Sequence, residues 1–263
     1  MHKRAWLLLG ALFPNIMAAQ AAKTLQIAAD NIVVRFATSQ SETAAREILA
    51  AAVEAREELA KLDRLASLKF DKLTSLRAVE IWLSATTYEF CQITGRPWWQ
   101  ASVYRSGIIY LQPLRVLRER GSLATTLRHE LMHHWVEELS QGNSPRWLSE
   151  ALAIYHSGEI ALLKPARQKV KPTELRWREL DKRLERTATQ AEAVQLYFQL
   201  YFLGQFLEKN FTLEKIARLL QSLGEQKTFA QAGREHWGEE TQTIEKNWRQ
   251  YAQEKLNTVA FFK

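Results

Sequence analysis

Cysteine is almost absent from this chain of 263 residues, since Cys91 is the only one. A single cysteine excludes an internal disulfide, and its position far from the amino terminus excludes a lipoprotein anchor there. The sequence also lacks internal repeats and any nucleic-acid-binding motif. With 46% hydrophobic and 25% charged residues, it predicts an ordinary globular protein of one or two domains with ample material for a core.

The amino-terminal segment differs in character from the rest. The basic stretch His2–Arg4 precedes the apolar run Ala5–Met17, and Ala19-Gln20-Ala21 supplies a small-x-small cleavage pattern. This order is typical of a secretory signal peptide over residues 1–21, and the apolar run is too short for a stable membrane span. The alternative interpretation of these residues is an amino-terminal helix of the core. We therefore expect an exported bacterial protein, periplasmic or secreted.

The net charge is moderately basic, at +7 for the whole chain. Removing residues 1–21 takes away Lys3 and Arg4 and no acids, which leaves 34 basic against 29 acidic residues, or +5. Such a charge can draw an exported protein toward anionic envelope surfaces. The basic residues are scattered among acids at helical spacing, however, which favours a solvated surface and no nucleic-acid partner.

The motif that carries chemistry is His129-Glu130-x-x-His133, within RHELMHHW. Residues four apart share a helix face, so the two histidines can direct their nitrogens at one metal ion. Glu130 lies about 100° around the helix, where a general base for a metal-bound water would sit. The helix is apolar over most of its surface, and buried polar groups need partners, which zinc would supply. The alternative is that the HExxH pattern occurs here by chance.

A tetrahedral catalytic site needs a third protein ligand. The candidate is Glu150, in PRWLSEALA, which follows the turn Gln141–Pro145 in the first turns of a second helix. A reversal at this turn brings Glu150 back over the face that carries the histidines. Alone, Glu150 is equally a favourable charge near a helix amino terminus. The HELMH sequence upstream favours the ligand.

HELMH followed by PRWLSEALA resembles the gluzincin metallopeptidases, and most closely the bacterial peptidase MA-like family. That family pairs an HExxH helix with a W-L-x-E-G-[LF]-A helix, and the resemblance covers roughly residues 100–251. It implies that His129, His133 and Glu150 bind one zinc ion per chain and that Glu130 is the base.

Two positions depart from the family pattern. Ala151 stands where the family usually has glycine, and both residues are small. Ile154 stands where thermolysin-type gluzincins hold an aspartate that supports a ligand, and Glu137 is the candidate replacement, with an exposed surface role as the alternative. The family also has a tyrosine ahead of an apolar helix. Tyr201 is our choice for a phenol that donates to the oxyanion, with Tyr197 in reserve and a core tyrosine as the alternative.

The predicted fold class is α+β. A zincin-like, thermolysin-type lobe of sheet and helices occupies residues 22–140, a helical lobe occupies residues 141–263, and the active site lies between them. Periodicity, turns and caps predict the elements of the first lobe: strands within Leu25–Ala37 around Asp30-Asn31, a helix over Glu42–Leu65 capped by Ser41, a strand over Arg77–Ser84, a helix over Thr86–Ile93 closed at Gly95, and a hairpin of Trp99–Arg105 with Gly107–Leu111.

In the resembled family the last strand before the HExxH helix borders the cleft, and either hairpin strand is a candidate for the sheet edge. Trp98-Trp99 is expected in the core, with a position lining the cleft as the alternative. After the basic linker Lys164–Pro172, further helices are predicted with Gly224 and Gly238 as carboxy-terminal caps: Glu174–Arg186, Ala191–Lys209, Leu213–Leu223, Thr228–Trp237 and Thr241–Glu254.

The resemblance implies a zinc metallopeptidase that hydrolyses peptide bonds with a zinc-activated water and Glu130 as general base. Its expected partner is a peptide or protein substrate, for which the cell envelope is one source. The alternative is a non-catalytic, zinc-stabilised binding module of the envelope. A metal-free adaptor, in which the HELMH side chains merely pair with neighbours, is a weaker alternative. Retention of Glu130 argues against both, because a purely structural site does not need the base.

Overall fold

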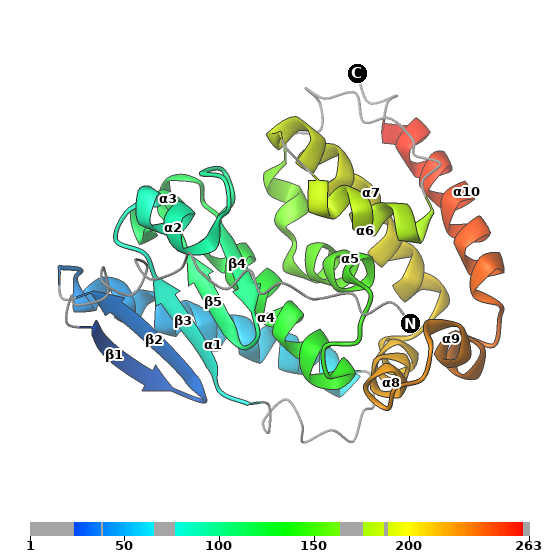
Figure 1. Cartoon of the computed structure of the whole chain (residues 1–263), viewed down its shortest axis with the longest axis horizontal. Coiled ribbons are helices and arrows are strands. Elements are labelled where there is room, and N and C mark those ends of the chain that lie inside the picture. Colours follow the sequence, from blue (N-terminus) through cyan, green and yellow to red (C-terminus); the bar gives the residue numbers. More distant parts are fainter. Residues whose placement is uncertain (1–23, 38, 66–76, 164–175, 187–188, 260–263) are drawn as a thin grey trace, which may run out of the picture.

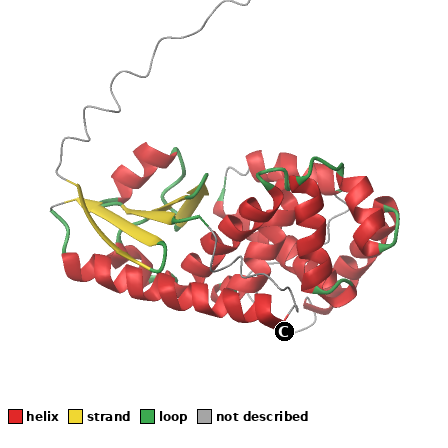
Figure 2. Cartoon of the chain, turned by 90° about the horizontal axis from the view of Figure 1, so that it is seen from below, coloured by secondary structure: helices red, strands yellow, loops and turns green. Residues whose placement is uncertain are grey.

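The computed structural model describes residues 24–37, 39–65, 77–163, 176–186 and 189–259. They form a mixed α+β protein with a five-stranded sheet and its helices at one end and an almost entirely helical carboxy-terminal part (Figure 1). Figure 2 shows the same division from below, with the strands gathered at one end. The signal-peptide prediction for residues 1–21 and the linker Lys164–Pro172 lie outside the described residues.

The sheet has the order β1-β2-β3-β5-β4, so β4 forms one of its edges. The two hairpins, β1–β2 and β4–β5, are antiparallel. The inner pairs, β2–β3 and β3–β5, are parallel and need helical crossovers, which α1 and α2 provide. The strands are β1 (Thr24–Ala29), β2 (Ile32–Ala37), β3 (Val79–Leu83), β4 (Ser102–Arg105) and β5 (Ile108–Leu111).

Both hairpin turns fall where the sequence predicts them. Asp30 and Asn31 have φ angles of 49° and 60°, and Ser106 and Gly107 have 46° and 84°. Positive φ at both central residues gives the turn a twist that matches the right-handed twist of the flanking strands. These two-residue turns fix the register of the strands, including that of β4 at the sheet edge.

Helix α1 (Glu42–Leu65) packs on β2 and α4, and Figure 1 shows it running past the sheet toward the helical part. Ser41 caps it as predicted, since its Oγ accepts a hydrogen bond from the Thr43 amide at 3.1 Å. Its buried residues recur at intervals of three and four, which places them on one face: Ala45, Ile48, Ala52, Ala55 and Leu59.

Helix α2 (Thr87–Thr94) is also confirmed, with Thr86 as its amino-terminal cap and Gly95, at φ 67°, as its carboxy-terminal cap. The sequence reading missed the short helix α3 (Leu114–Glu119). Its six residues are too few to show a hydrophobic period.

The remaining helices match their predicted positions except η2, which was not predicted, and the last helix extends beyond Glu254. They are α4 (Leu123–Ser140), α5 (Arg146–Ser157), the 3₁₀ helix η2 (Glu159–Leu162), α6 (Trp177–Arg186), α7 (Gln190–Asn210), α8 (Leu213–Gly224), α9 (Phe229–Trp237) and α10 (Thr241–Val259).

Gly238 caps α9 with φ 74°, as predicted. Gly224 does not cap α8, because it is the last helical residue and Glu225 follows as the cap. A Cβ on Gly224 would lie 2.7 Å from the carbonyl oxygen of Leu139. Its small size therefore lets α8 approach α4, and the prediction that it serves as a cap was wrong.

Most of the buried apolar residues form one continuous core that extends from Ile32 in the sheet to Ala252 in α10. Stacked aromatic pairs strengthen its helical end: Trp147 and Trp177 lie 4.5 Å apart between ring centroids. The predicted lobes, residues 22–140 and 141–263, thus share one core. Among the described residues, no helix is long and apolar enough to cross a membrane.

Candidate metal centre

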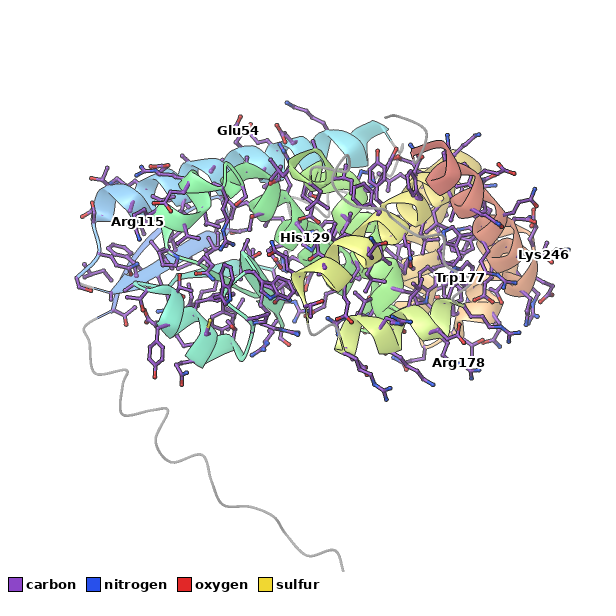
Figure 3. The ribbon with its side chains drawn as sticks, turned by 90° about the horizontal axis from the view of Figure 1, so that it is seen from above. Glu54, Arg115, His129, Trp177, Arg178 and Lys246 are labelled. Atoms are coloured by element: carbon purple, nitrogen blue, oxygen red, sulfur yellow. The ribbon has the colours of Figure 1, made fainter. Side chains whose placement is uncertain are left out.

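Two histidines on α4 face each other one helical turn apart. The Nε2 atoms of His129 and His133 lie 3.0 Å apart, and the His129 side chain is only 8% exposed. Figure 3 places His129 in the interior, between the sheet and the helical part. The spacing of four residues produces this juxtaposition directly, because residues i and i+4 lie on one face of a helix.

Helix α5 adds a carboxylate to this pair. Gln141 and Gly142, with φ angles of 50° and 77°, reverse the chain after α4. Glu150 then lies beside the histidines, with its Oε2 3.7 Å from the Nε2 of His129 and 3.7 Å from that of His133. The structure therefore brings together the three residues that the sequence predicts as metal ligands.

The donor set fits a tetrahedral zinc ion. Bonds of about 2.1 Å in tetrahedral geometry separate two donor atoms by about 3.4 Å. The observed separations of 3.0, 3.7 and 3.7 Å bracket that value. Among the described residues, His129, His133 and Glu150 form a group whose donor atoms can hold a metal ion together. Three protein ligands leave a fourth position for water or substrate, which is the pattern of a catalytic site.

The outward-facing nitrogens of both imidazoles also have partners. Nδ1 of His129 lies 2.8 Å from Oε1 of Glu159, and Nδ1 of His133 lies 2.7 Å from Oγ of Ser149. Such partners orient an imidazole and leave the opposite nitrogen for a metal. The sequence analysis did not identify either residue. The candidate that it gave, Glu137, instead interacts with Tyr104.

The charges around the two imidazoles favour a cation. Burial alone lowers the pKa of a histidine. At His129 the carboxylates of Glu159, Glu130 and Glu150 outweigh burial and raise the pKa to about 10. At His133, burial and then the charge of His129 lower the pKa. A site that stabilises one positive charge among three carboxylates suits a divalent metal ion.

Glu130 lies beside the candidate ligands and lines the same cavity. Its Oε1 accepts a hydrogen bond from the hydroxyl of Ser102 on β4. Burial raises the pKa of Glu130 to about 7, although His129 and Ser102 oppose the shift. A carboxylate whose pKa lies near neutrality can both accept and return a proton.

The two candidate tyrosines of α7 lie in different surroundings. Tyr197 lines the cavity with the metal-site residues, and burial raises its pKa. Tyr201 is not among the cavity-lining residues; its ring packs against Tyr155 and Phe202, with centroids 5.7 and 5.5 Å away. The geometry therefore favours Tyr197 over Tyr201 as a residue that can reach a bound molecule.

The cavity has a volume of about 380 Å³. Its walls come from β4 and the loop before it, α4, α5, η2 and α7. Trp99 lines it and Trp98 is 63% exposed, so the prediction that this pair lies in the core was wrong. The pair belongs to the loop between α2 and β4, and Gln112 binds the carbonyl of Trp98 at 3.0 Å, which holds the loop at the surface.

Neither the models of known protein families nor the curated proteins give a match to this chain.

Proposed function

We propose that the protein is an exported zinc metallopeptidase of the gluzincin type, with a zincin-like fold. The observation that carries the proposal is the set of three donor atoms 3.0 to 3.7 Å apart, beside Glu130 and open to a cavity. The partner of His129, Glu159, adds support, because zinc-binding histidines commonly pair with a carboxylate. The amino-terminal pattern supports a periplasmic or secreted location.

A zinc ion held by His129, His133 and Glu150 would supply a Lewis acid that lowers the pKa of water and polarises a carbonyl group. Glu130 takes a proton from the attacking water and later returns it to the leaving nitrogen. Its pKa of about 7 suits both transfers. Ser102 keeps the carboxylate of Glu130 at the cavity wall by donating a hydrogen bond to Oε1.

Two further elements fit a peptide substrate. Tyr197 lines the cavity, and its hydroxyl can donate to the negative charge that develops on the carbonyl oxygen. Strand β4 is a sheet edge, and Ser102, Val103 and Tyr104 of that strand line the cavity. An extended peptide can add to such an edge through main-chain hydrogen bonds. A peptide or protein of the cell envelope is the substrate that the proposed location favours.

The test begins with zinc per chain in the protein without residues 1–21, compared with Glu150→Ala and Glu130→Gln. We expect one zinc in the parent and in Glu130→Gln, and weakened binding in Glu150→Ala. Peptide cleavage should occur in the parent and fall at least about a thousandfold in Glu130→Gln. Absence of zinc after resupply would refute the proposal. Zinc binding without cleavage of any peptide would identify a non-catalytic binding module instead.

A further inference from the structure

The loop between α2 and β4, which forms one wall of the cavity, is held firmly by arginines. Arg120 donates to the carbonyl of Trp99 at 3.0 Å, and Arg105 donates to the carbonyl of Thr94. The backbone amide of Arg96 donates to Oγ1 of Thr94 at 3.1 Å. The guanidinium groups of Arg105 and Arg120 thus have backbone partners, and the start of the loop has a defined position.

Two other arginines, Arg96 and Arg146, line the cavity itself. Arg96 is partly buried, yet within the described residues no hydrogen bond or ion pair engages its guanidinium. Arg146, the first residue of α5, has its Nε 3.6 Å from Oε1 of Glu150, which is longer than a hydrogen bond. Both side chains therefore retain donors for a ligand.

The two guanidinium groups are close enough to affect each other. Burial lowers the pKa of Arg96, the charges of Arg146 and Arg105 lower it further, and the carboxylate of Glu150 opposes the shift. Among the described residues no carboxylate forms a hydrogen bond or ion pair with Arg96, and a partly buried cation beside other cations is stabilised when a further anion joins them. The cavity lining holds three carboxylates, Glu130, Glu150 and Glu159, and two guanidiniums. With one divalent zinc ion the site carries a charge of +1, which one substrate carboxylate would neutralise.

We propose that Arg96 and Arg146 form a subsite that binds a carboxylate of the peptide substrate. The inference rests on the proposed peptidase function and names its substrate class. Guanidinium groups bind carboxylates through paired, charge-assisted hydrogen bonds. The carboxylate comes either from the carboxy terminus, in which case the enzyme removes residues from that end, or from an aspartate or glutamate near the scissile bond.

The test measures binding and cleavage separately. Zinc-loaded Glu130→Gln protein is immobilised and exposed to a mixture of pentapeptides, prepared once with free carboxy termini and once with amidated termini. Retained peptides are identified by mass spectrometry. If the subsite binds the carboxy terminus, we expect peptides with free carboxy termini to be enriched about tenfold or more over amidated peptides. If it binds an acidic side chain, we expect a similar enrichment of peptides with aspartate or glutamate over neutral peptides within the amidated mixture. Adding Arg96→Gln should reduce that enrichment to near unity, and Arg96→Lys should restore only part of it.

Arg115→Gln is the control for loss of one positive charge, because Arg115 is 84% exposed on α3 and lies at the outer end of the molecule in Figure 3. Its enrichment should equal that of the parent. Arg146→Gln should act as Arg96→Gln does, and zinc content is measured in each variant because Arg146 lies near Glu150. Enrichment that survives both substitutions, or retention without any acid preference, overturns the subsite.

The two proposals fail in different ways. If the parent protein, which retains Glu130, cleaves both mixtures without a preference for acidic peptides, the proposed peptidase activity stands and the carboxylate subsite is refuted. Zinc-dependent retention of acids, lost in Arg96→Gln, with no cleavage of either mixture would leave the subsite in place and refute the peptidase. Retention of neither mixture would also overturn the subsite.

Discussion

Gly204 lies in the middle of α7, where this helix packs closely against α5. Of the described glycines, it has the shortest distance from an added Cβ to a neighbouring atom. A Cβ there would lie 2.5 Å from the carbonyl oxygen of Ala151 and 2.6 Å from the Cβ of Tyr155. Both neighbours are fixed to the backbone of α5 and cannot rotate away. Gly204→Ala therefore requires the two helices to separate by about 0.9 Å to restore an ordinary contact of about 3.4 Å.

The expected magnitude follows from two opposing terms. Overpacking of this kind costs about 1–3 kcal/mol, and alanine gains up to about 1 kcal/mol over glycine in helix propensity. Because the clash involves backbone atoms, we expect the upper end of that cost, about 3 kcal/mol, and therefore a net loss of about 2 kcal/mol in the free energy of unfolding. Gly233→Ala is the matched control, since its Cβ would meet only a side-chain methyl of Thr241 at 2.8 Å. A rotation relieves that contact, and the net change should be near zero.

Urea unfolding and thermal melting of both variants measure the difference. At about 2–4 °C per kcal/mol for a chain of this size, Gly204→Ala should melt about 4–8 °C below the parent and Gly233→Ala close to it. Zinc affinity should also fall in Gly204→Ala, because Glu150 is the residue before the displaced Ala151. Equal stability and zinc affinity in the two variants would refute the close contact between α5 and α7.

Three further predictions concern single side chains. Glu159→Gln should weaken zinc binding about 10- to 100-fold in chelator competition, because His129 loses its charged partner; unchanged affinity would exclude that role. Tyr197→Phe should lower kcat about 100- to 1,000-fold with little change in KM, and Tyr201→Phe should match the parent; the reverse order would reassign the oxyanion donor. Burial lowers the pKa of His156 in the folded protein. As pH falls below about 6.5, this imidazole is therefore protonated in the unfolded chain while it stays neutral in the folded chain. Stability should therefore fall on the acid side, and His156→Gln should reduce that fall, measured by urea midpoints from pH 7.5 to 5.5; an identical pH profile would contradict it.

The three candidate ligands were predictable because they depend on local geometry. The spacing of His129 and His133 fixes their relation once α4 forms, and the turn after α4 needs only to reverse the chain to bring Glu150 back. The strands, the hairpin turns and most helices likewise follow from period and turn chemistry. The class of fold and the candidate metal site can therefore be predicted from short stretches of sequence.

The residues that were missed depend on tertiary placement. Glu159 reaches His129 only because Gly158, at φ 72°, ends α5 and turns the chain into η2. Arg96 reaches the cavity through the anchored loop before β4, and no spacing in the sequence relates it to Arg146. Gly158 could have been used to predict that the chain changes direction after α5, but the sequence does not give the angle of that change.

The choice between the two tyrosines shows where a local signal existed and was not used. Tyr197, Tyr201 and Gly204 stand at i, i+4 and i+7, so they share one face of α7. That helix is apolar on nearly all sides, and periodicity could not tell which face meets α5. A glycine inside a helix is unfavourable unless a neighbour needs the space, so Gly204 marks the contacting face. Tyr201, one turn away, falls within that contact beside Tyr155. Tyr197, two turns away, is the tyrosine of this face that lines the cavity, together with Gln190, Ala193 and Val194 of the same helix.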